Sequence, residues 1–288
     1  MTFPRITVIT PSYNQGSYLE ETILSVLSQG YPNLEYIIMD GGSTDRSKEI
    51  IQKHEHQLTY WISDTDNGMY DAIQKGFDKS TGEIMTWINS DDTLSKNSLF
   101  TVAEIFSDFQ NIKWLSGTPN QMDESGRIIG TDGVPKWNKY RYLNFDFKYI
   151  QQEGTFWRRS LWIESGSKIA AHLMLAGDLE LWSRFFQHEQ LYYISGILGT
   201  FRMRKSNQKS LEHLEGYHNE AHLILAKMSV SEEEEKLLKI KNSFLWKLLK
   251  RRPFRFLNNF LHYNELESKI NKFPPALVYN RFKQRFVL

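Results

Sequence analysis

Two adjacent aspartates follow an apolar run in the first third of the chain, in the segment Asn89-Ser90-Asp91-Asp92. Neighbouring carboxylates at the end of a buried strand repel each other unless a cation or hydrogen-bond donors compensate their charge. Mg²⁺ and Mn²⁺ prefer oxygen ligands of this kind and commonly hold substrate phosphates at the same time. The pair therefore predicts a divalent-metal site, although an Asx turn that caps the following helix explains it equally well.

A second acidic segment, Asp40-Gly41-Gly42-Ser43-Thr44-Asp45, follows another apolar run. Its glycines allow close approach of a ligand to the backbone, and Asp40 can accept hydrogen bonds from a base or a ribose. The alternative is an ordinary turn between a strand and a helix, capped by Ser43 or Asp45. The sequence contains neither G-x-G-x-x-G after its first strand nor a Walker A loop, which disfavours a Rossmann dehydrogenase and a P-loop kinase.

A third candidate is Asp178, in the segment Leu175-Ala176-Gly177-Asp178-Leu179-Glu180-Leu181-Trp182. Helical spacing places Asp178 on the same face as Leu181 and Trp182. A carboxylate beside an apolar surface can have a raised pKa and can act as a general base. A simple helix N-cap is the alternative interpretation.

Alternating strand and helix patterns must position these acidic segments. Strands are expected at 6–10, 34–39, 58–62 and 83–88. A helix is expected to start at Ser17, where Glu20 completes a capping-box pattern. Further helices are expected at 45–54, 69–79 and 98–109. Further on, short strands are expected at 114–117 and 155–157, a helix at 175–189 and a strand-rich stretch at 191–203. This order predicts a doubly wound, mostly parallel α/β sheet, whose ligands bind beyond the carboxyl ends of its strands. The first two acidic segments lie at such ends.

The composition predicts a folded protein of the cytoplasm. Hydrophobic residues make up 40% of the 288 residues and charged residues 24%, which is typical of a globular chain. The absence of cysteine excludes disulfides, zinc–thiolate sites and cysteine nucleophiles. The N-terminus leads directly into a strand pattern and does not resemble a signal peptide, and no stretch approaches about 18 consecutive apolar residues.

These segments, in this order, resemble family 2 glycosyltransferases, which have the GT-A fold. The resemblance covers about residues 4–210. It is carried by the opening strand and loop (6–14), the first helix (17–29), the turn Met39–Asp45, the helix Gly68-Met69-Tyr70-Asp71-Ala72-Ile73-Gln74-Lys75-Gly76, the DXD-like Asn89–Asp92, and the acceptor-side segments 153–159 and 177–182.

The resemblance implies a metal-dependent, inverting transfer of a single sugar, of the hexosyl class, from a nucleotide-diphosphate sugar to an acceptor hydroxyl. A UDP-sugar donor, Mn²⁺ or Mg²⁺, and a glycan or lipid-linked acceptor of cell-surface polysaccharide or glycolipid synthesis are implied. Asp178 would be the catalytic base, and Asp92 and Asp91 the metal ligands. The remaining donor-binding residues would be Pro11, Tyr13, Asp40, Asp66, Lys75, Asp91 and Arg204. Trp157 is a candidate platform for a sugar ring, with core packing as the alternative.

The sequence departs from the family pattern at four of these places. Gly41 stands where a second aspartate is common, so recognition of the base is expected to rest on Asp40 and Asp66. Gln74 stands where asparagine is common. Gly177 stands where a glutamate often precedes the catalytic base, and Glu180 is a rival candidate for that base. Arg204 stands where some members have a metal-binding histidine, and it can pair with the diphosphate instead. No Gln-x-x-Arg-Trp motif is present, which favours transfer of a single sugar.

Residues 211–288 are expected to form a helical, basic region outside the catalytic domain, which is expected to span 1–210. From Lys236 onward there are thirteen Lys and Arg residues and only two acidic residues. The segment 244–257 mixes bulky apolar and cationic residues, which predicts contact with an anionic membrane surface, on the inner face of the cell membrane. The alternative is a helical hairpin packed on the catalytic domain through Trp246 and other apolar residues. No nucleic-acid-binding module accompanies the basic region, and no nucleic-acid partner is expected.

Two other functions remain compatible with the sequence. A sugar nucleotidyltransferase would need a glycine-rich, basic signature near the first strand, and residues 11–16 lack one. A nucleotide-sugar-binding relative without transferase activity would lose its acidic site residues, whereas Asp91, Asp92 and Asp178 are all present.

Overall fold

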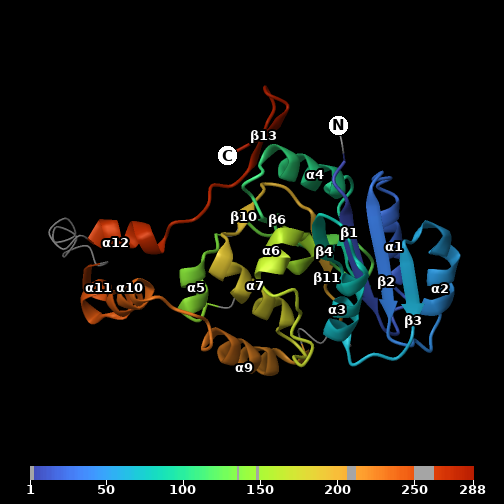
Figure 1. Ribbon diagram of the computed structural model, residues 1–288, viewed down its shortest axis with the longest axis horizontal. Helices are drawn as coiled ribbons and strands as arrows, with labels where there is room; N and C mark the ends of the chain where they lie inside the picture. Colours follow the sequence, from blue (N-terminus) through green and yellow to red (C-terminus); the bar gives the residue numbers. More distant parts are fainter. Residues whose placement is uncertain (1–2, 135, 147–148, 206–211, 250–262) are drawn as a thin grey trace.

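The computed structural model describes residues 3–134, 136–146, 149–205, 212–249 and 263–288. A seven-stranded sheet with the order β10-β6-β9-β4-β1-β2-β3 forms its centre (Figure 1). The strands are β1 (Ile6–Ser12), β2 (Leu34–Asp40), β3 (Tyr60–Ser63), β4 (Ile84–Trp87), β6 (Trp114–Ser116), β9 (Thr155–Arg158) and β10 (Tyr192–Tyr193). Strands β1 to β4 are parallel, as predicted, whereas β9 is antiparallel to both of its neighbours. The predicted α/β class with a mostly parallel sheet is confirmed.

Both faces of this sheet are covered by helices. Side chains of a strand alternate between the faces; Val8 and Ile38 therefore pack on one side, and Ile9 and Ile37 on the other. The first face contacts α1 (Leu19–Leu27), α2 (Ser47–His54) and α4 (Ser98–Asp108), and the second contacts α3 (Met69–Lys79), α6 (Arg159–Glu164) and α7 (Gly177–His188). Because both faces are buried, β1 reads in the sequence as a nearly continuous apolar run.

The start of α1 differs from the prediction. The helix begins at Leu19, and its N-cap residue Tyr18 makes no side-chain capping bond, so the capping box expected of Ser17 and Glu20 does not form. Instead, the backbone N–H groups of Tyr18 and Leu19 both donate to the carbonyl oxygen of Gln15. The turn before the helix thus satisfies these donors without a side chain.

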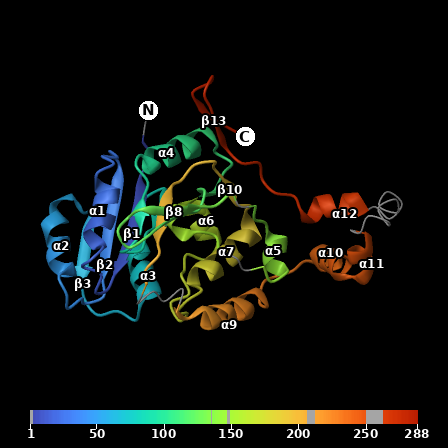
Figure 2. The same ribbon diagram turned by 180° about the vertical axis from the view of Figure 1, so that it is seen from behind.

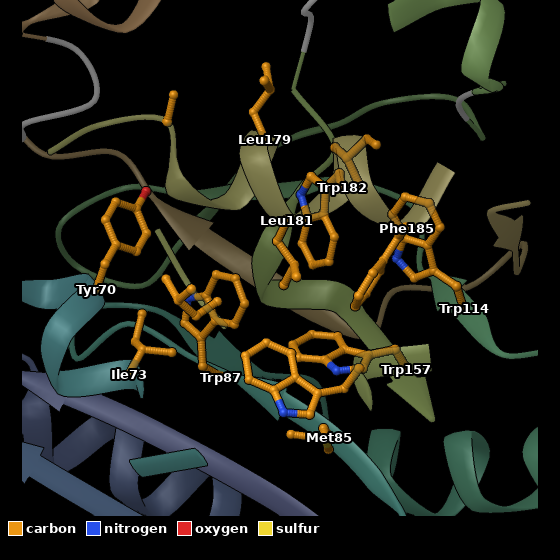
Figure 3. Packing of buried hydrophobic residues seen from close by; sticks show 14 of the residues in the cluster. Tyr70, Ile73, Met85, Trp87, Trp114, Trp157, Leu179, Leu181, Trp182 and Phe185 are labelled. Carbon is orange, nitrogen blue, oxygen red and sulfur yellow. The ribbon is translucent and has the colours of Figure 1, made fainter. Parts of the chain in front are cut away.

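A cluster of tryptophans fixes α7 against the sheet (Figure 3). Trp87 and Trp182 stack with their ring centroids 5.8 Å apart, and Trp157 meets both of them edge-on, with centroids 5.6 Å away. Trp157 is fully buried, so the prediction that it is a sugar platform is wrong and the core-packing alternative holds. Since Trp182 lies four residues after Asp178, the cluster also fixes the helix that carries this aspartate.

A smaller sheet, with the order β5-β11-β7-β8, lies beside the main one. Its strands are β5 (Thr93–Leu94), β7 (Asn120–Met122), β8 (Ile128–Thr131) and β11 (Gly199–Arg202). β5 follows Asp92 directly and pairs with β11. This pairing brings the chain around Arg202 and Arg204 to the two aspartates.

The compact core extends beyond the boundary predicted at residue 210. Helix α9 (Leu214–Leu225) packs on α7, and its residues Tyr217, Ala221 and Leu225 belong to the same buried cluster as the tryptophans. The sequence alone did not reveal this, because a helical pattern does not show which surface its apolar face covers. The helix should be counted with the catalytic unit.

Helix α5 (Lys139–Leu143) lies near α7. The last three described helices form an arm at one side of the molecule (Figures 1 and 2). They are α10 (Glu232–Asn242), α11 (Phe244–Leu249) and α12 (Tyr263–Ile270). Trp246 is buried against Leu237 and Ile270, which belong to the arm itself, whereas the packing alternative placed it on the catalytic domain. Most cations of the predicted membrane-contacting segment 244–257 lie outside the described residues. Within the described part of the chain, no helix has the length and apolarity needed to cross a membrane.

Candidate active site

The first two acidic segments meet at one edge of the main sheet. Ser12, the last residue of β1, is in register with Asp40 at the end of β2, and Asp40 is in register with Ser63 at the end of β3. The segment with Asp91 and Asp92 follows β4, the other neighbour of β1. The parallel strands thus place these segments together at the edge where ligands bind in such sheets.

Asp40 organises the turn that was predicted to bind the nucleoside. Its carboxylate accepts hydrogen bonds from the backbone N–H of Ser43 at 2.9 Å, from the hydroxyl of Ser43 at 2.6 Å and from the hydroxyl of Ser63 at 2.7 Å. A Cβ atom at Gly41 would lie 2.7 Å from Oδ2 of Asp66. The missing side chain at Gly41 therefore leaves room for the Asp66 carboxylate, which lies where an aspartate at position 41 would project.

The other predicted nucleoside contacts surround this turn. Pro11 is buried within β1, in register with Met39, whereas the side chain of Tyr13 is 61% exposed beyond the end of the strand. Lys75, on α3, pairs with Asp71 at 2.7 Å. That hydrogen bond is the main reason for the raised pKa of Lys75, and the charge of Asp66 adds to the effect. Lys75 thus lies within electrostatic range of Asp66.

Asp91 forms an ion pair with Arg204, with a distance of 3.0 Å between Oδ2 of Asp91 and Nε of Arg204. Arg204 also donates to the side-chain oxygen of Gln15. It lines a pocket of about 400 Å³. The pocket is bounded by Tyr13, Asn14, Gln15, Ser17, Tyr18, Glu124 and Arg204. Tyr13 and Arg204, far apart in the sequence and both predicted to bind the donor, thus share one pocket.

Asp92 is fully buried, unlike its neighbour. One carboxylate oxygen accepts the backbone N–H of Arg202 at 2.7 Å, and the other accepts the amide of Asn89 at 3.2 Å. Asp92 also contacts the buried side chain of Glu153. Burial raises the pKa of both carboxyl groups. The charge of Glu153 raises the pKa of Asp92 further, whereas the hydrogen bond with Asp92 lowers the pKa of Glu153.

Arg202 is a buried cation that holds the aspartate loop in place. Its Nε donates to the carbonyl oxygen of Asp91 at 2.6 Å, and Nη2 pairs with Glu21 on α1, also at 2.6 Å. Nη1 donates to the carbonyl oxygens of Asp123 and Glu124. The side chain ties β11, the first helix and the turn between β7 and β8 to the site. Sequence reasoning missed this role, because its only signal was a second arginine next to Arg204.

Asp178 is the second residue of α7 and is partly buried. Burial raises the pKa of Asp178 to about 6, and the charge of Glu220 contributes further. Asp178 has several tyrosines as electrostatic neighbours. Its charge adds to the burial that raises the pKa values of Tyr70, Tyr142, Tyr149 and Tyr217. This carboxylate can accept a proton near neutral pH, as a general base must.

Two contacts fix the start of α7. Glu220, on α9, accepts the backbone N–H groups of residues 174–176 at 2.8–3.0 Å. The ring of Tyr70 lies so close to Gly177 that a Cβ atom there would be 2.7 Å from it. The closeness of this ring explains why residue 177 is a glycine and not the glutamate that is common in the family. Glu220 carried no sequence signal, because its partners are more than 40 residues away.

Glu153 connects the two parts of the site. The charges of Asp178 and of Asp91 both help to raise its pKa, after the larger effect of burial. The aspartate pair and Asp178 therefore both act electrostatically on this buried glutamate. Glu153 opened a segment that the sequence singled out, but its position near these groups depends on the pairing of β9, which follows it, with β4 and β6.

The donor set fits a hard divalent cation. The carboxylates of Asp91 and Asp92 are neighbours in a poorly solvated place, and the charge of Asp91 opposes ionisation of Asp92, so a positive ion would relieve their repulsion. Oδ1 of Asn89 is buried there without a hydrogen-bond partner. Among the described residues, no three acidic or histidine side chains form a complete metal site by themselves. Mg²⁺ and Mn²⁺ bind through one or two carboxylates together with substrate phosphates, so a donor would complete the shell.

Sequence comparison identifies the family. The profile of "Glycosyl transferase family 2" matches residues 7–152, just over half of the chain. The chain belongs to glycosyl transferase family 2. A relative from Haemophilus influenzae, named an uncharacterized glycosyltransferase, is 37% identical over 102 residues, which cover 34% of this chain and 41% of that protein. The putative teichuronic acid biosynthesis glycosyltransferase TuaG of Bacillus subtilis is 35% identical over 99 residues, which cover 33% and 39%. The similarity thus spans about two fifths of each of these relatives.

Solved structures confirm the fold of this family 2 protein. TarS of S. aureus (residues 1–349), in complex with UDP-GlcNAc, superimposes with a TM-score of 0.65 and 15% identity, over 87% of this chain and 77% of TarS. The mannosyltransferase PcManGT of Pyrobaculum calidifontis, in complex with GDP-Man and Mn²⁺, gives a TM-score of 0.55 and 16% identity, over 94% and 88%. The GT-A fold predicted from the sequence is confirmed.

Proposed function

We propose that this protein is an inverting, metal-dependent glycosyltransferase that moves a single hexose from a UDP-sugar to an acceptor hydroxyl. The acceptor is a glycan or a lipid-linked glycan of cell-surface polysaccharide or glycolipid synthesis, made at the cytoplasmic side of the membrane. Family membership supports the reaction class. The observation that carries the proposal is a partly exposed carboxylate, Asp178, with its pKa raised to about 6 beside the buried acidic cluster at the strand ends.

The donor binds at the carboxyl ends of β1, β2 and β4. Tyr13 and the edge of β1 at Pro11 contact the base, Asp66 accepts hydrogen bonds from the nucleoside, and Asp40 keeps the turn in shape. Lys75 and Arg204 supply positive charge on opposite sides of the donor. TarS, which has this fold, binds UDP-GlcNAc, and this supports a UDP-sugar here.

The cation would be held by Asp91, with Asp92 behind it. Bound there, a Mn²⁺ or Mg²⁺ ion neutralises the charge that develops on the departing diphosphate. The complex of PcManGT, which has this fold, with GDP-Man and Mn²⁺ supports a divalent metal here. Arg202 keeps the loop of both aspartates rigid, and Arg204 can turn from Asp91 to a diphosphate oxygen, because guanidinium groups bind phosphates in a bidentate manner.

Asp178 removes the proton from the acceptor hydroxyl as that oxygen attacks the anomeric carbon. The new glycosidic bond forms on the face opposite the bond to the diphosphate, which breaks with its electron pair going to the phosphate oxygen. The configuration at the anomeric carbon is therefore inverted. The proton remains on Asp178, whose raised pKa makes the transfer favourable near neutral pH.

A panel of nucleotide sugars tests this function. The full chain is incubated with UDP-, GDP- and dTDP-sugars and Mn²⁺, with and without candidate glycan acceptors, and release of the nucleoside diphosphate is measured. Binding of each nucleoside diphosphate is measured separately by calorimetry. We expect binding and acceptor-stimulated release with a UDP-sugar. Binding without release under any condition would instead favour a nucleotide-sugar-binding protein, and failure to bind any nucleotide would refute the proposal.

A further inference from the structure

The described chain ends in a two-stranded hairpin, β12 (Val278–Asn280) and β13 (Arg285–Val287), which projects past α4 (Figures 1 and 2). Its base is fixed to the body of the protein. Leu277 is fully buried, and its backbone N–H donates to Tyr193 at 2.7 Å, while its carbonyl oxygen accepts from Ser195 at 3.0 Å. The ring of Phe286 packs against the core on the side of α4. Beyond this base the hairpin and its turn are largely exposed, including Val278 and Tyr279 of β12.

That turn presents a phenylalanine to solvent. The side chain of Phe282 is 101% exposed. The backbone of the turn is nevertheless ordered, because Oδ1 of Asn280 accepts the N–H groups of Phe282 at 3.0 Å and of Lys283 at 2.9 Å. The exposed ring is thus held outward by a defined turn, anchored through the buried Leu277.

Cations surround this ring. Arg281, Lys283 and Arg285 are all exposed, and the sequence from Val278 to Val287 contains no acidic residue. The carboxylate of Glu104, on α4, meets the backbone of Phe286 at the base of the hairpin and not at its tip. The tip therefore combines one fully exposed aromatic ring with three positive charges.

We propose that this hairpin tip docks on an anionic membrane surface. Phe282 enters the boundary between headgroups and acyl chains, and the three cations bind lipid phosphates, which is the combination that interfacial anchors use. A protein partner fits less well, because a stable protein interface needs about 800 Å² from each side, and the turn of a two-stranded hairpin offers much less. This inference goes beyond the proposed enzymatic function, does not depend on it, and concerns a different segment from 244–257.

Vesicle binding of the full chain tests the proposal. Vesicles of phosphatidylcholine with 30% phosphatidylglycerol are compared with vesicles of pure phosphatidylcholine by co-sedimentation. We expect binding only to the anionic vesicles. Phe282→Ala should lower the partition coefficient about tenfold, and the triple variant Arg281→Gln, Lys283→Gln, Arg285→Gln about a hundredfold, at about fivefold per cation.

Matched controls separate the hairpin from general charge and hydrophobicity. Ile129→Ala removes an exposed apolar side chain from β8, and the triple variant Lys48→Gln, Lys136→Gln, Lys227→Gln removes the same charge from exposed sites elsewhere. The first should bind as the wild type does, and the second should lower binding much less than the hairpin triple variant. Because the chain has no cysteine, Phe282→Cys and Ile129→Cys each accept a single environment-sensitive fluorophore.

The fluorophore at position 282 should shift to the blue on anionic vesicles, and the one at position 129 should not. Unchanged vesicle binding by both hairpin variants would overturn the proposal, as would binding during which the label at 282 stays in water. Absence of any binding to anionic vesicles would also overturn it. Concentration-dependent self-association that Phe282→Ala abolishes would show that the tip contacts a second copy of the chain instead.

Discussion

Asp91 and Asp92 are neighbours in the chain but have different surroundings. Asp91 pairs with Arg204, which lines the pocket, whereas Asp92 is fully buried, accepts the N–H of Arg202 and contacts Glu153. We therefore propose that Asp91 is the carboxylate that meets the ion and the donor directly. Asp92 then lies behind Asp91, where it holds the loop in place and adds negative charge close to the ion.

Replacement of the proposed base should stop transfer without stopping donor binding. We expect Asp178→Asn to lower kcat by a factor of about 10² to 10⁴, because the amide cannot accept the acceptor proton. The dissociation constant for UDP, measured by calorimetry in the presence of Mn²⁺, should change less than threefold. A large loss of UDP affinity would instead assign Asp178 to the donor site.

The rate should also follow the ionisation of Asp178. The base works only when it has lost its proton, and its pKa is about 6, above the ordinary value of about 3.9. We therefore expect kcat/KM for the acceptor to rise about tenfold per pH unit below pH 6 and to level off above about pH 7. An acid limb centred near pH 4 in the pH–rate profile would contradict this assignment. The variant Glu153→Gln should keep the limb near pH 6, because it leaves Asp178 in place.

At the scale of elements, the beginning of α7 decides where Asp178 lies. Three backbone N–H groups before the helix bind Glu220, and Gly177 lies against the ring of Tyr70. Both partners come from other helices, α9 and α3. The position of the base thus depends on contacts among three helices.

Gly177→Ala tests this contact. The added methyl group would lie 2.7 Å from a buried ring that has little room to move, so we expect a loss of about 1–3 kcal/mol in the free energy of unfolding. Transfer activity should fall as well, since α7 must shift. Gly133→Ala is the matched control, because nothing lies within 4 Å of a Cβ atom there, and it should be nearly neutral in urea denaturation. Equal stability of both variants would show that the helix start tolerates a side chain.

Much of the fold and of the candidate site could be predicted from the sequence. The features that could not be predicted depend on packing between segments that are far apart in the chain. The strands β1 to β4 and the helices between them follow from apolar periodicity, and the sites at their ends follow from the rule for parallel sheets. The antiparallel strand β9, the buried state of Trp157 and the role of Glu220 depend on which distant surfaces meet. Local patterns carry no information on such pairings. The predicted capping box failed because the helix begins two residues after Ser17, and the preceding turn binds the N–H groups of Tyr18 and Leu19 through the backbone.

For the whole molecule, the structure changes where the catalytic unit ends. A chain that stops at residue 210 would lose the burial of Tyr217, Ala221 and Leu225 and the bonds of Glu220. We expect such a chain to lose about 5 kcal/mol or to fail to fold, because the total stability of a domain is only about 5–15 kcal/mol. A chain that stops at Val230 keeps α9 and should unfold at a clearly higher temperature. Equal melting temperatures of the two chains, measured by circular dichroism, would restore the boundary at 210.

The indole cluster around Trp182 also gives the protein an optical property. Trp87, Trp157 and Trp182 lie with ring centroids 5.6–5.8 Å apart, two of them stacked and the third nearly perpendicular to both. Chromophores so close together share their excited states, so the native protein should show an exciton couplet in its circular dichroism that separated indoles lack. Trp182 is on the same helix as Asp178, and a movement of that helix when an acceptor or a donor binds would alter the couplet. The helix that carries the proposed base therefore has an intrinsic spectroscopic probe, which requires neither a label nor turnover.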